Sequence, residues 1–231
     1  MERAQFEAIL LGPKPSGINW FPEVEDIWRV SGELEDGEAA EWRSRLEHGT
    51  RVFLEFGDWI EQHGFPAADT AADRIFGSPF YVGMSLSWSE VPLDERLAFV
   101  AAAKEPFQCI RRRFPKLSFR TNLFMLWDQV CHGFTDPITG WDEDLPDGER
   151  RRPVLHLSGD QKIVHDAMFD ALVELLQHPD EWVQDSALHG LGHSRHPKAA
   201  ETVQAYIDAY PDELEGRALE WCEECRDGSV M

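Results

Sequence analysis

The chain has 231 residues, and its 43 Asp and Glu residues outnumber 22 Lys and Arg, which gives a formal net charge of −21 at pH 7. A hydrophobic content of 42% is typical of a globular chain and excludes a largely disordered one. The negative charge disfavours nucleic acid and anionic membranes as partners, and it favours a basic protein.

Apolar segments and cysteines in the sequence give information about the cellular compartment of the protein. No apolar run in the sequence approaches the roughly 20 residues of a membrane span, and residues 1–17 lack the sustained apolar segment of a secretory signal. Four cysteines in a chain of this length predict reduced thiols rather than a disulfide framework. We therefore expect a cytoplasmic protein.

Residues 1–150 are predicted to form a divergent, mostly helical region with long loops. Gly and Pro in residues 1–38 predict irregular structure there. From Ala39 onward apolar residues recur at helical spacing, and Gly64 is expected to end that helical stretch. The Gly and Pro content of residues 74–92 predicts a surface loop, with one short strand as the alternative.

Two more helices and a long loop complete this region. Residues 92–115 are predicted to be helical, with a kink or break at Pro106. Residues 119–134 form a very apolar segment, which predicts a central helix. Residues 135–153 follow as a polar loop of unusual length, and such loops are either functional or mobile.

Residues 151–231 are more regular. They are predicted to hold four amphipathic helices, over 159–178, 179–193, 197–210 and 211–225. A proline begins each of the last three, where the first helical turn tolerates it, and Asp180 and Asp212 are candidate N-caps.

An internal repeat is visible among these helices, because Pro179 and Pro211 lie 32 residues apart in similar contexts. The repeat aligns Ala167 with Ala199, Ala171 with Val203 and Leu175 with Ile207. The segment PDEWVQDSALHGLG resembles the first helix of a HEAT repeat through Pro179, Asp180, Val183, Ala187, Leu188, Leu191 and Gly192. This resemblance covers residues 159–226, with a unit shorter than usual, and residues 1–150 show no repeat.

The resemblance implies an α-solenoid fragment with a protein-binding role. We therefore predict an all-α fold, in which a HEAT-like helical-hairpin stack at the C-terminus lies on a divergent helical N-terminal part. The two parts, residues 1–150 and 151–231, are expected to form one continuous globular unit.

Histidines and cysteines in the last third raise the question of a metal site. His189 and His193 are at i and i+4 on the helix predicted over 179–193, a spacing that suits metal ligands, whereas His196 precedes Pro197 and belongs to a turn. On that helix, one stripe carries Val183, Ala187 and Leu191, and the nearly opposite side carries Trp182, His189 and His193.

Completing a zinc site would require Cys222 and Cys225. These cysteines lie at i and i+3 of a predicted helix rather than in a tight-turn knuckle. We interpret the histidines as structural, stacked on Trp182 or a neighbouring helix, and we expect no metal or other cofactor. The alternative is a metal-dependent enzyme that uses His189 and His193, with Cys222 and Cys225 as further ligands.

Signals for function come mainly from the surface. The sequence contains no Gly-x-Ser-x-Gly, Walker or Gly-x-Gly-x-x-Gly motif, whereas its acidic clusters contain Trp, a residue enriched at interface hot spots. We predict a non-enzymatic acidic protein-binding module, in particular an immunity protein of bacterial type that inhibits a basic toxin or enzyme. A generic HEAT-like scaffold or regulatory subunit is the alternative. The residues predicted to contact the partner are Trp141, Asp142, Glu143, Asp144 and Trp182.

Overall fold

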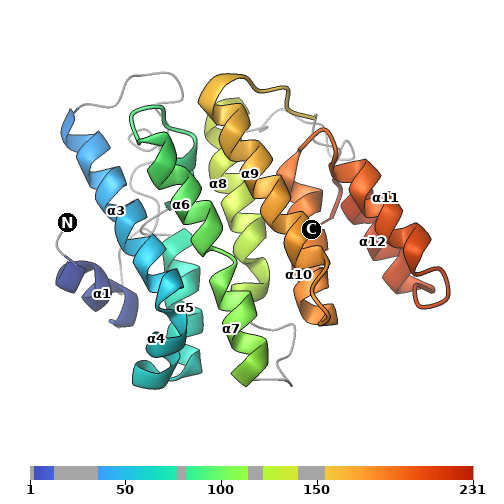
Figure 1. The fold of residues 1–231 in the computed structure, drawn as a ribbon, viewed down its shortest axis with the longest axis horizontal. Helices are drawn as coiled ribbons and strands as arrows, with labels where there is room; N and C mark the ends of the chain where they lie inside the picture. The colour runs from blue at the N-terminus through green and yellow to red at the C-terminus, as the bar shows by residue number, and fades with distance from the viewer. Residues whose placement is uncertain (1–2, 13–35, 77–81, 114–121, 140–153, 231) are drawn as a thin grey trace, which may run out of the picture.

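The computed structural model describes residues 3–12, 36–76, 82–113, 122–139 and 154–230. Within these ranges every regular element is a helix (Figure 1). The α-helices are α1 (Arg3–Leu11), α3 (Asp36–Leu54), α4 (Phe56–His63), α5 (Phe65–Phe76), α6 (Leu93–Ala102), α7 (Glu105–Arg113), α8 (Leu126–Thr139), α9 (Gly159–Leu176), α10 (Glu181–Ser194), α11 (Ala199–Ala209) and α12 (Arg217–Asp227). Two 3₁₀-helices, η1 (Val82–Leu86) and η2 (Asn122–Met125), accompany them. The predicted all-α class is confirmed.

Local signals explain where several N-terminal helices end. Gly64 has φ +82° and donates its N–H to the Ile60 carbonyl, so it ends α4 as predicted. The predicted break near Pro106 is confirmed, but it falls at residues 103–104, which places Pro106 in the first turn of α7. Residues 82–86 form η1, whose five residues are all buried, so the predicted surface loop was wrong there, and the alternative strand is not formed.

Two further predictions for the N-terminal region were wrong. Residues 3–11, predicted to be irregular, form α1, because Phe6 and Leu10 at i and i+4 are buried against α3 and α5. The polar loop was predicted to begin at residue 135, but α8 continues to residue 139, where Ile138 packs against the core. Residues 140–153 lie outside the described part of the chain.

The last four helices form two hairpins, α9–α10 and α11–α12. Asp180 is the N-cap of α10 as predicted, because its carboxylate accepts a hydrogen bond from the Trp182 N–H at 3.1 Å. Asp212 does not cap α12, which begins only at residue 217, after Gly216 takes φ +54° and interrupts the helical path.

One hydrophobic core extends from Phe6 to Val230 and passes through all these helices. Helix α8 is central, as predicted: it contacts α5, α10, η1 and η2, and Trp127 is among its fully buried side chains. The helices lie side by side in a row that ends with α11 and α12 (Figure 1). This is a helical stack, while its assignment as a HEAT-like arrangement remains an interpretation. Among the described helices, none has the length and apolar character required to cross a membrane.

Candidate functional site

The contact between helices α8 and α10 carries the candidate site. A Cβ added to Gly190 would lie 2.7 Å from the Trp127 Cβ, so only a glycine lets α10 approach α8 this closely. Close helix approach therefore accounts for a glycine at position 190 of α10. At Gly192 the approaching element is α12, with the Cys225 Cα 3.1 Å from where a Cβ would lie.

This close approach brings two i, i+4 pairs together across the α8–α10 contact. Helix α8 contributes Asp128 and His132, and α10 contributes His189 and His193. The Asp128 Oδ1 lies 3.1 Å from the His132 Nε2 and 3.2 Å from the His193 Nε2. The rings of His132 and His193 have their centroids 4.8 Å apart. We refer to Asp128, His132 and His193 as the α8–α10 cluster.

The α8–α10 cluster is largely shielded from solvent. The exposed fractions of the side chains are 15% for Asp128, 27% for His132 and 12% for His193. Burial alone would raise the pKa of the Asp128 carboxyl, but its interaction with His132 and the positive potential of His193 and His189 outweigh burial, so this pKa is lowered. The carboxyl is therefore held in its ionised form.

His189 is the fourth member of the two pairs, and aromatic rings enclose it. Its ring stacks on Phe124 at 5.8 Å and 25°, and on Trp221 of α12 at 6.5 Å and 18°. It meets His193 edge to face at 4.8 Å. This agrees with the predicted packing of a structural histidine on a neighbouring helix, although its aromatic neighbours are Phe124 and Trp221 rather than Trp182.

The metal set considered from the sequence is not assembled. Among the described residues, one group of three His, Cys, Asp or Glu side chains has its ligand atoms within 4.8 Å of one another. It consists of Asp128, His132 and His193. Cys222 and Cys225 do not join His189 and His193 in such a group. Both thiols are buried, and burial raises the pKa of Cys222 to about 11 and also raises that of Cys225, which disfavours the thiolate that metals bind.

The predicted partner contacts divide into two groups. Trp141, Asp142, Glu143 and Asp144 lie outside the described residues. Trp182 is only 2% exposed, and its ring packs against Phe107 at 5.7 Å and Phe124 at 6.2 Å. Trp182 is thus part of the core, and its assignment as a partner contact was wrong, because α7 and η2 cover the side of α10 that was taken to be open.

His196 and His165 form a second polar group where α9 meets the end of α10. His196 lies in the turn before α11, as predicted, stacked on Phe169 at 4.1 Å with its Nε2 3.2 Å from the Asp166 Oδ1. The His165 Nε2 donates to the Ser194 carbonyl at 2.7 Å, and burial lowers the pKa of His165 to about 4. These contacts fasten two helices together and are structural.

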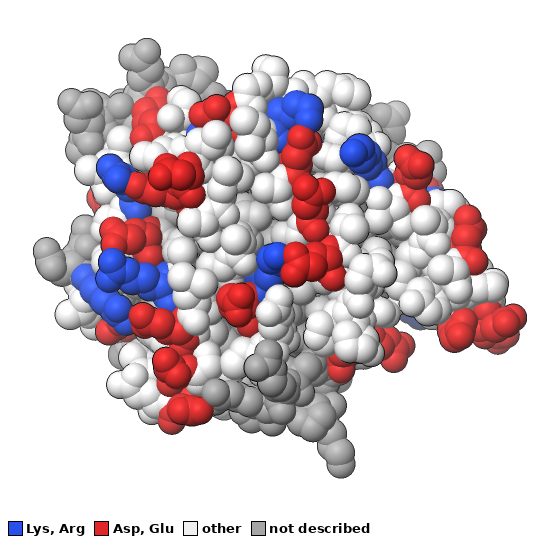
Figure 2. Space-filling view, viewed as in Figure 1, with Lys and Arg blue, Asp and Glu red and all other residues white. Residues whose placement is uncertain are grey.

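The outer face of the α11–α12 hairpin is strongly acidic. Residues 199–230 contain nine acidic side chains and two arginines. One of these arginines, Arg226, already pairs with Asp227 at 3.0 Å and with Glu223 at 3.8 Å. Figure 2 shows acidic side chains along the edge of the molecule where α11 and α12 lie. The exposed acids are Glu201, Asp208, Asp212, Glu213, Glu215, Glu220 and Glu224, which we call the acidic edge.

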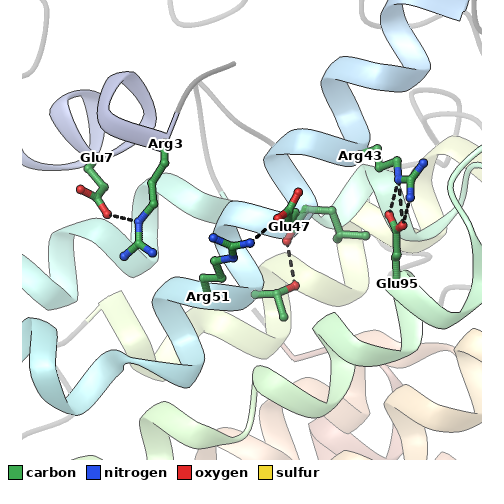
Figure 3. Close-up of polar contacts among 8 residues, drawn as sticks. Arg3, Glu7, Arg43, Glu47, Arg51 and Glu95 are labelled. Carbon is green, nitrogen blue, oxygen red and sulfur yellow. Dashed lines mark hydrogen bonds and ion pairs between the residues drawn. The ribbon is translucent and has the colours of Figure 1, made fainter.

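A groove of about 740 Å³ lies between α3 and α6. Its charged lining is mutually matched: Arg43 forms an ion pair with Glu95, and Arg51 pairs with Glu47 at 2.6 Å (Figure 3). Glu90 is the one further charged residue of the lining, so the groove presents a surplus of only one negative charge to a ligand, unlike the acidic edge.

Comparison with known proteins does not extend this description. No protein-family model, no curated protein and no solved structure matches the chain.

Proposed function

We propose that this chain is an acidic protein-binding module that recognises a basic partner protein, with the acidic edge as a main contact surface. The observation that carries the proposal is the charge imbalance of residues 199–230, where two arginines cannot neutralise nine acids. Charge of one sign on one face steers a partner of opposite charge and raises its association rate.

The position of the acidic edge supports this role. Helices α11 and α12 pack mainly against each other and against α10, so among the described elements no other helix packs extensively against the far side of this hairpin. Tyr210 is 38% exposed there, with its ring 4.8 Å from that of Tyr206. An exposed tyrosine among acids offers apolar contact area next to the steering charges.

In its most specific form, the proposal is that of an immunity protein that inhibits a basic toxin or enzyme in the cytoplasm. Such an inhibitor needs a rigid acidic surface and no chemistry of its own. The Trp141 to Asp144 segment extends the proposal, because it adds three acids beside a Trp. A scaffold or regulatory subunit would use the same surface with a partner that has no toxic activity.

The test compares three triple charge reversals that change net charge equally. Asp212, Glu213 and Glu215 to Lys alter the acidic edge, Asp142, Glu143 and Asp144 to Lys alter the loop, and Glu61, Glu90 and Asp170 to Lys alter exposed acids elsewhere as the control. A partner captured by the wild-type protein is purified, and its association with each variant is followed by stopped flow at two salt concentrations.

We expect the wild-type association rate to fall as salt rises, and the edge variant to associate at least about tenfold more slowly at low salt. The control should stay close to wild type. An equal reduction in all three variants would indicate only the effect of net charge and would contradict a localised edge, as would an unchanged rate in the edge variant. Slow association of the loop variant alone would move the contact to residues 142–144.

A further inference from the structure

The α8–α10 cluster has the composition of a metal site. It brings two imidazole nitrogens and one carboxylate oxygen from two different helices to within 4.8 Å of one another. Each helix is rigid here: Trp127 and Val130 of α8 and Leu188 and Leu191 of α10 are fully or almost fully buried around the cluster. The three ligand atoms are therefore placed by the core and not by a flexible loop.

We propose that Asp128, His132 and His193 bind one divalent transition-metal ion, zinc in the first place, at the contact between α8 and α10. This proposal does not depend on the protein-binding function. It replaces the expectation, drawn from the sequence, that the protein binds no metal. That expectation concerned His189, His193, Cys222 and Cys225 as possible ligands. The packing of α8 against α10 assembles a different set of ligands.

The spacing of the ligand atoms fits such an ion closely. Zinc takes nitrogen and oxygen ligands at roughly 2.0–2.2 Å in tetrahedral geometry, which separates the ligand atoms by about 3.4 Å. The Asp128 Oδ1 lies 3.1 and 3.2 Å from the two Nε2 atoms, close to this value, and all three ligand atoms lie within 4.8 Å of one another. Rotation of these side chains about their own bonds would bring the three atoms to the separation required.

Hydrogen bonding alone accounts less well for the arrangement. The Asp128 Oδ1 is buried and, among the described residues, receives no hydrogen bond of acceptable geometry, even though two Nε2 atoms lie within 3.2 Å of it. Both imidazoles place an Nε2 atom beside the same carboxylate oxygen, so the three atoms surround a common point between α8 and α10. A metal ion at that point would satisfy the buried oxygen, whose loss of solvation is otherwise costly.

The cluster also offers an entry path and an open coordination position. His132 is the most exposed member, at 27%, so an ion would reach the cluster from its side. Three protein ligands leave a fourth tetrahedral position for water or an anionic group, as in zinc sites that are not closed by the protein. His189, edge to face with His193 at 4.8 Å and stacked on Phe124, fixes the orientation of the His193 ring.

The test is zinc binding by the purified full chain after treatment with a chelator. Isothermal titration with Zn²⁺ at pH 7.5 is compared among wild type and the variants Asp128→Asn, His132→Gln and His193→Gln. Two matched controls are His156→Gln, at an exposed histidine, and Cys222→Ser with Cys225→Ser. Substitution of Co²⁺ for Zn²⁺ adds a readout of ligand type, because its visible spectrum reports nitrogen and oxygen coordination.

We expect one Zn²⁺ per wild-type chain, at least 100-fold weaker binding in each cluster variant, and wild-type affinity in both controls. Zinc should also raise the melting temperature of wild type but not that of His132→Gln. Because His132 is the most exposed member, circular dichroism of this variant should match wild type without metal, which separates lost binding from lost folding.

Two results would overturn the proposal. One is a wild-type chain that binds zinc no more tightly than the His132→Gln variant does. The other is zinc binding that the double cysteine variant loses and the cluster variants keep, which would place the ion elsewhere. Neither result depends on whether a protein partner is found.

Discussion

Helices α10 and α12 occupy equivalent places in the 32-residue repeat, yet their surroundings are very different. Ten of the 14 residues of α10 are buried, compared with two of the 11 residues of α12. Helix α10 contacts α8, α9, α11 and α12, whereas α12 contacts only α10 and α11 among the described helices with substantial packing. The position of a helix in the stack, and not its repeat motif, thus decides how much of its surface is covered.

This difference explains the chemistry of each helix. A helix with neighbours on every side needs glycines for close approach, and it must satisfy any polar group that it buries. Accordingly α10 contains Gly190, Gly192 and two histidines that face rings or carboxylates. A helix at the end of the stack keeps a free face, on which α12 carries its acids.

The largest expected effect comes from breaking the close approach of α10. Gly190→Ala places a Cβ 2.7 Å from both the Trp127 Cβ and the Leu172 Cδ2. The Trp127 Cβ is next to the backbone and cannot move aside, so the helices must separate. We expect urea denaturation to show a loss of about 3 kcal/mol, since overpacking outweighs the gain of about 1 kcal/mol in helix propensity.

Gly49→Ala is the matched control for this substitution. Its Cβ would lie 3.2 Å from the Phe99 Cε2 and 3.3 Å from the Ile75 Cγ2, which are ends of side chains that can shift. We expect a net change within about 1 kcal/mol of zero, because a small packing cost offsets the gain in propensity. Equal losses in the two variants would contradict the special closeness of α8 and α10.

The sequence predicted those features that depend on neighbouring residues. The helical class, the cap at Asp180, the stop at Gly64 and the turn at His196 each follow from local backbone chemistry. Their signals lie within a few residues of the feature, so no knowledge of the tertiary structure is needed. Gly216 shows the limit of this reasoning, since Pro211 predicted a helix start that the chain delays by six residues.

The candidate site was predicted only in part, because it joins two helices far apart in the sequence. His193 was identified, but its neighbours Asp128 and His132 were not, although Asp128 and His132 stand at i and i+4 on a segment already predicted to be a central helix. That spacing was the available signal. No pattern within either segment of the sequence indicates that α8 faces α10 at these residues. Trp182 was wrongly predicted as a partner contact for the same reason, because the helices that cover it are distant in the sequence.

A second test of the comparison concerns His165, whose buried hydrogen bond to the Ser194 carbonyl joins α9 to the end of α10. The folded pKa of His165, about 4, lies below its unfolded value of about 6.5, so the folded state binds the proton more weakly. Stability is therefore highest above pH 6.5 and falls as pH decreases toward 4. We expect His165 to account for a loss of about 2 kcal/mol between pH 7 and pH 5.

His165→Gln measures this contribution. Its amide can still donate to the Ser194 carbonyl, the contact that His165 makes at 2.7 Å, but it does not titrate. Urea denaturation at pH 5 and pH 7 should show a flatter pH dependence in this variant than in wild type. His156→Gln, at an exposed histidine, should leave the pH dependence unchanged. If both variants keep the wild-type dependence, His165 is not the group responsible.

The smallest expected effect concerns Asp185, where α10 meets the α11–α12 hairpin. Burial, followed by repulsion from Glu181 and Asp180, raises the pKa of Asp185 to about 7. The groups that sense it from the other helices are Tyr206 of α11 and the Cys222 and Cys225 thiols of α12, which are neutral near pH 7 and have raised pKa values. No positive group among the causes of this shift compensates the carboxylate when it ionises.

The sign at Asp185 is opposite to that at His165. Because the folded state binds the proton more tightly, stability is highest at low pH and is lost as pH rises from the unfolded pKa of about 4 through 7. Asp185→Asn removes the ionisation, so we expect it to stabilise the protein by about 1 kcal/mol at pH 8, a figure reduced for the partial exposure of this side chain, and by less than half as much at pH 5, where the unfolded carboxyl is already mostly ionised and the folded one is not. Asp170→Asn, at an exposed carboxylate of α9, is the control and should be neutral at both pH values. Thermal unfolding of the three proteins at pH 5 and pH 8 measures the difference. A stabilisation of Asp185→Asn that is equal at both pH values would mean that the contact between α10 and the end hairpin does not bury this carboxylate as the structure shows.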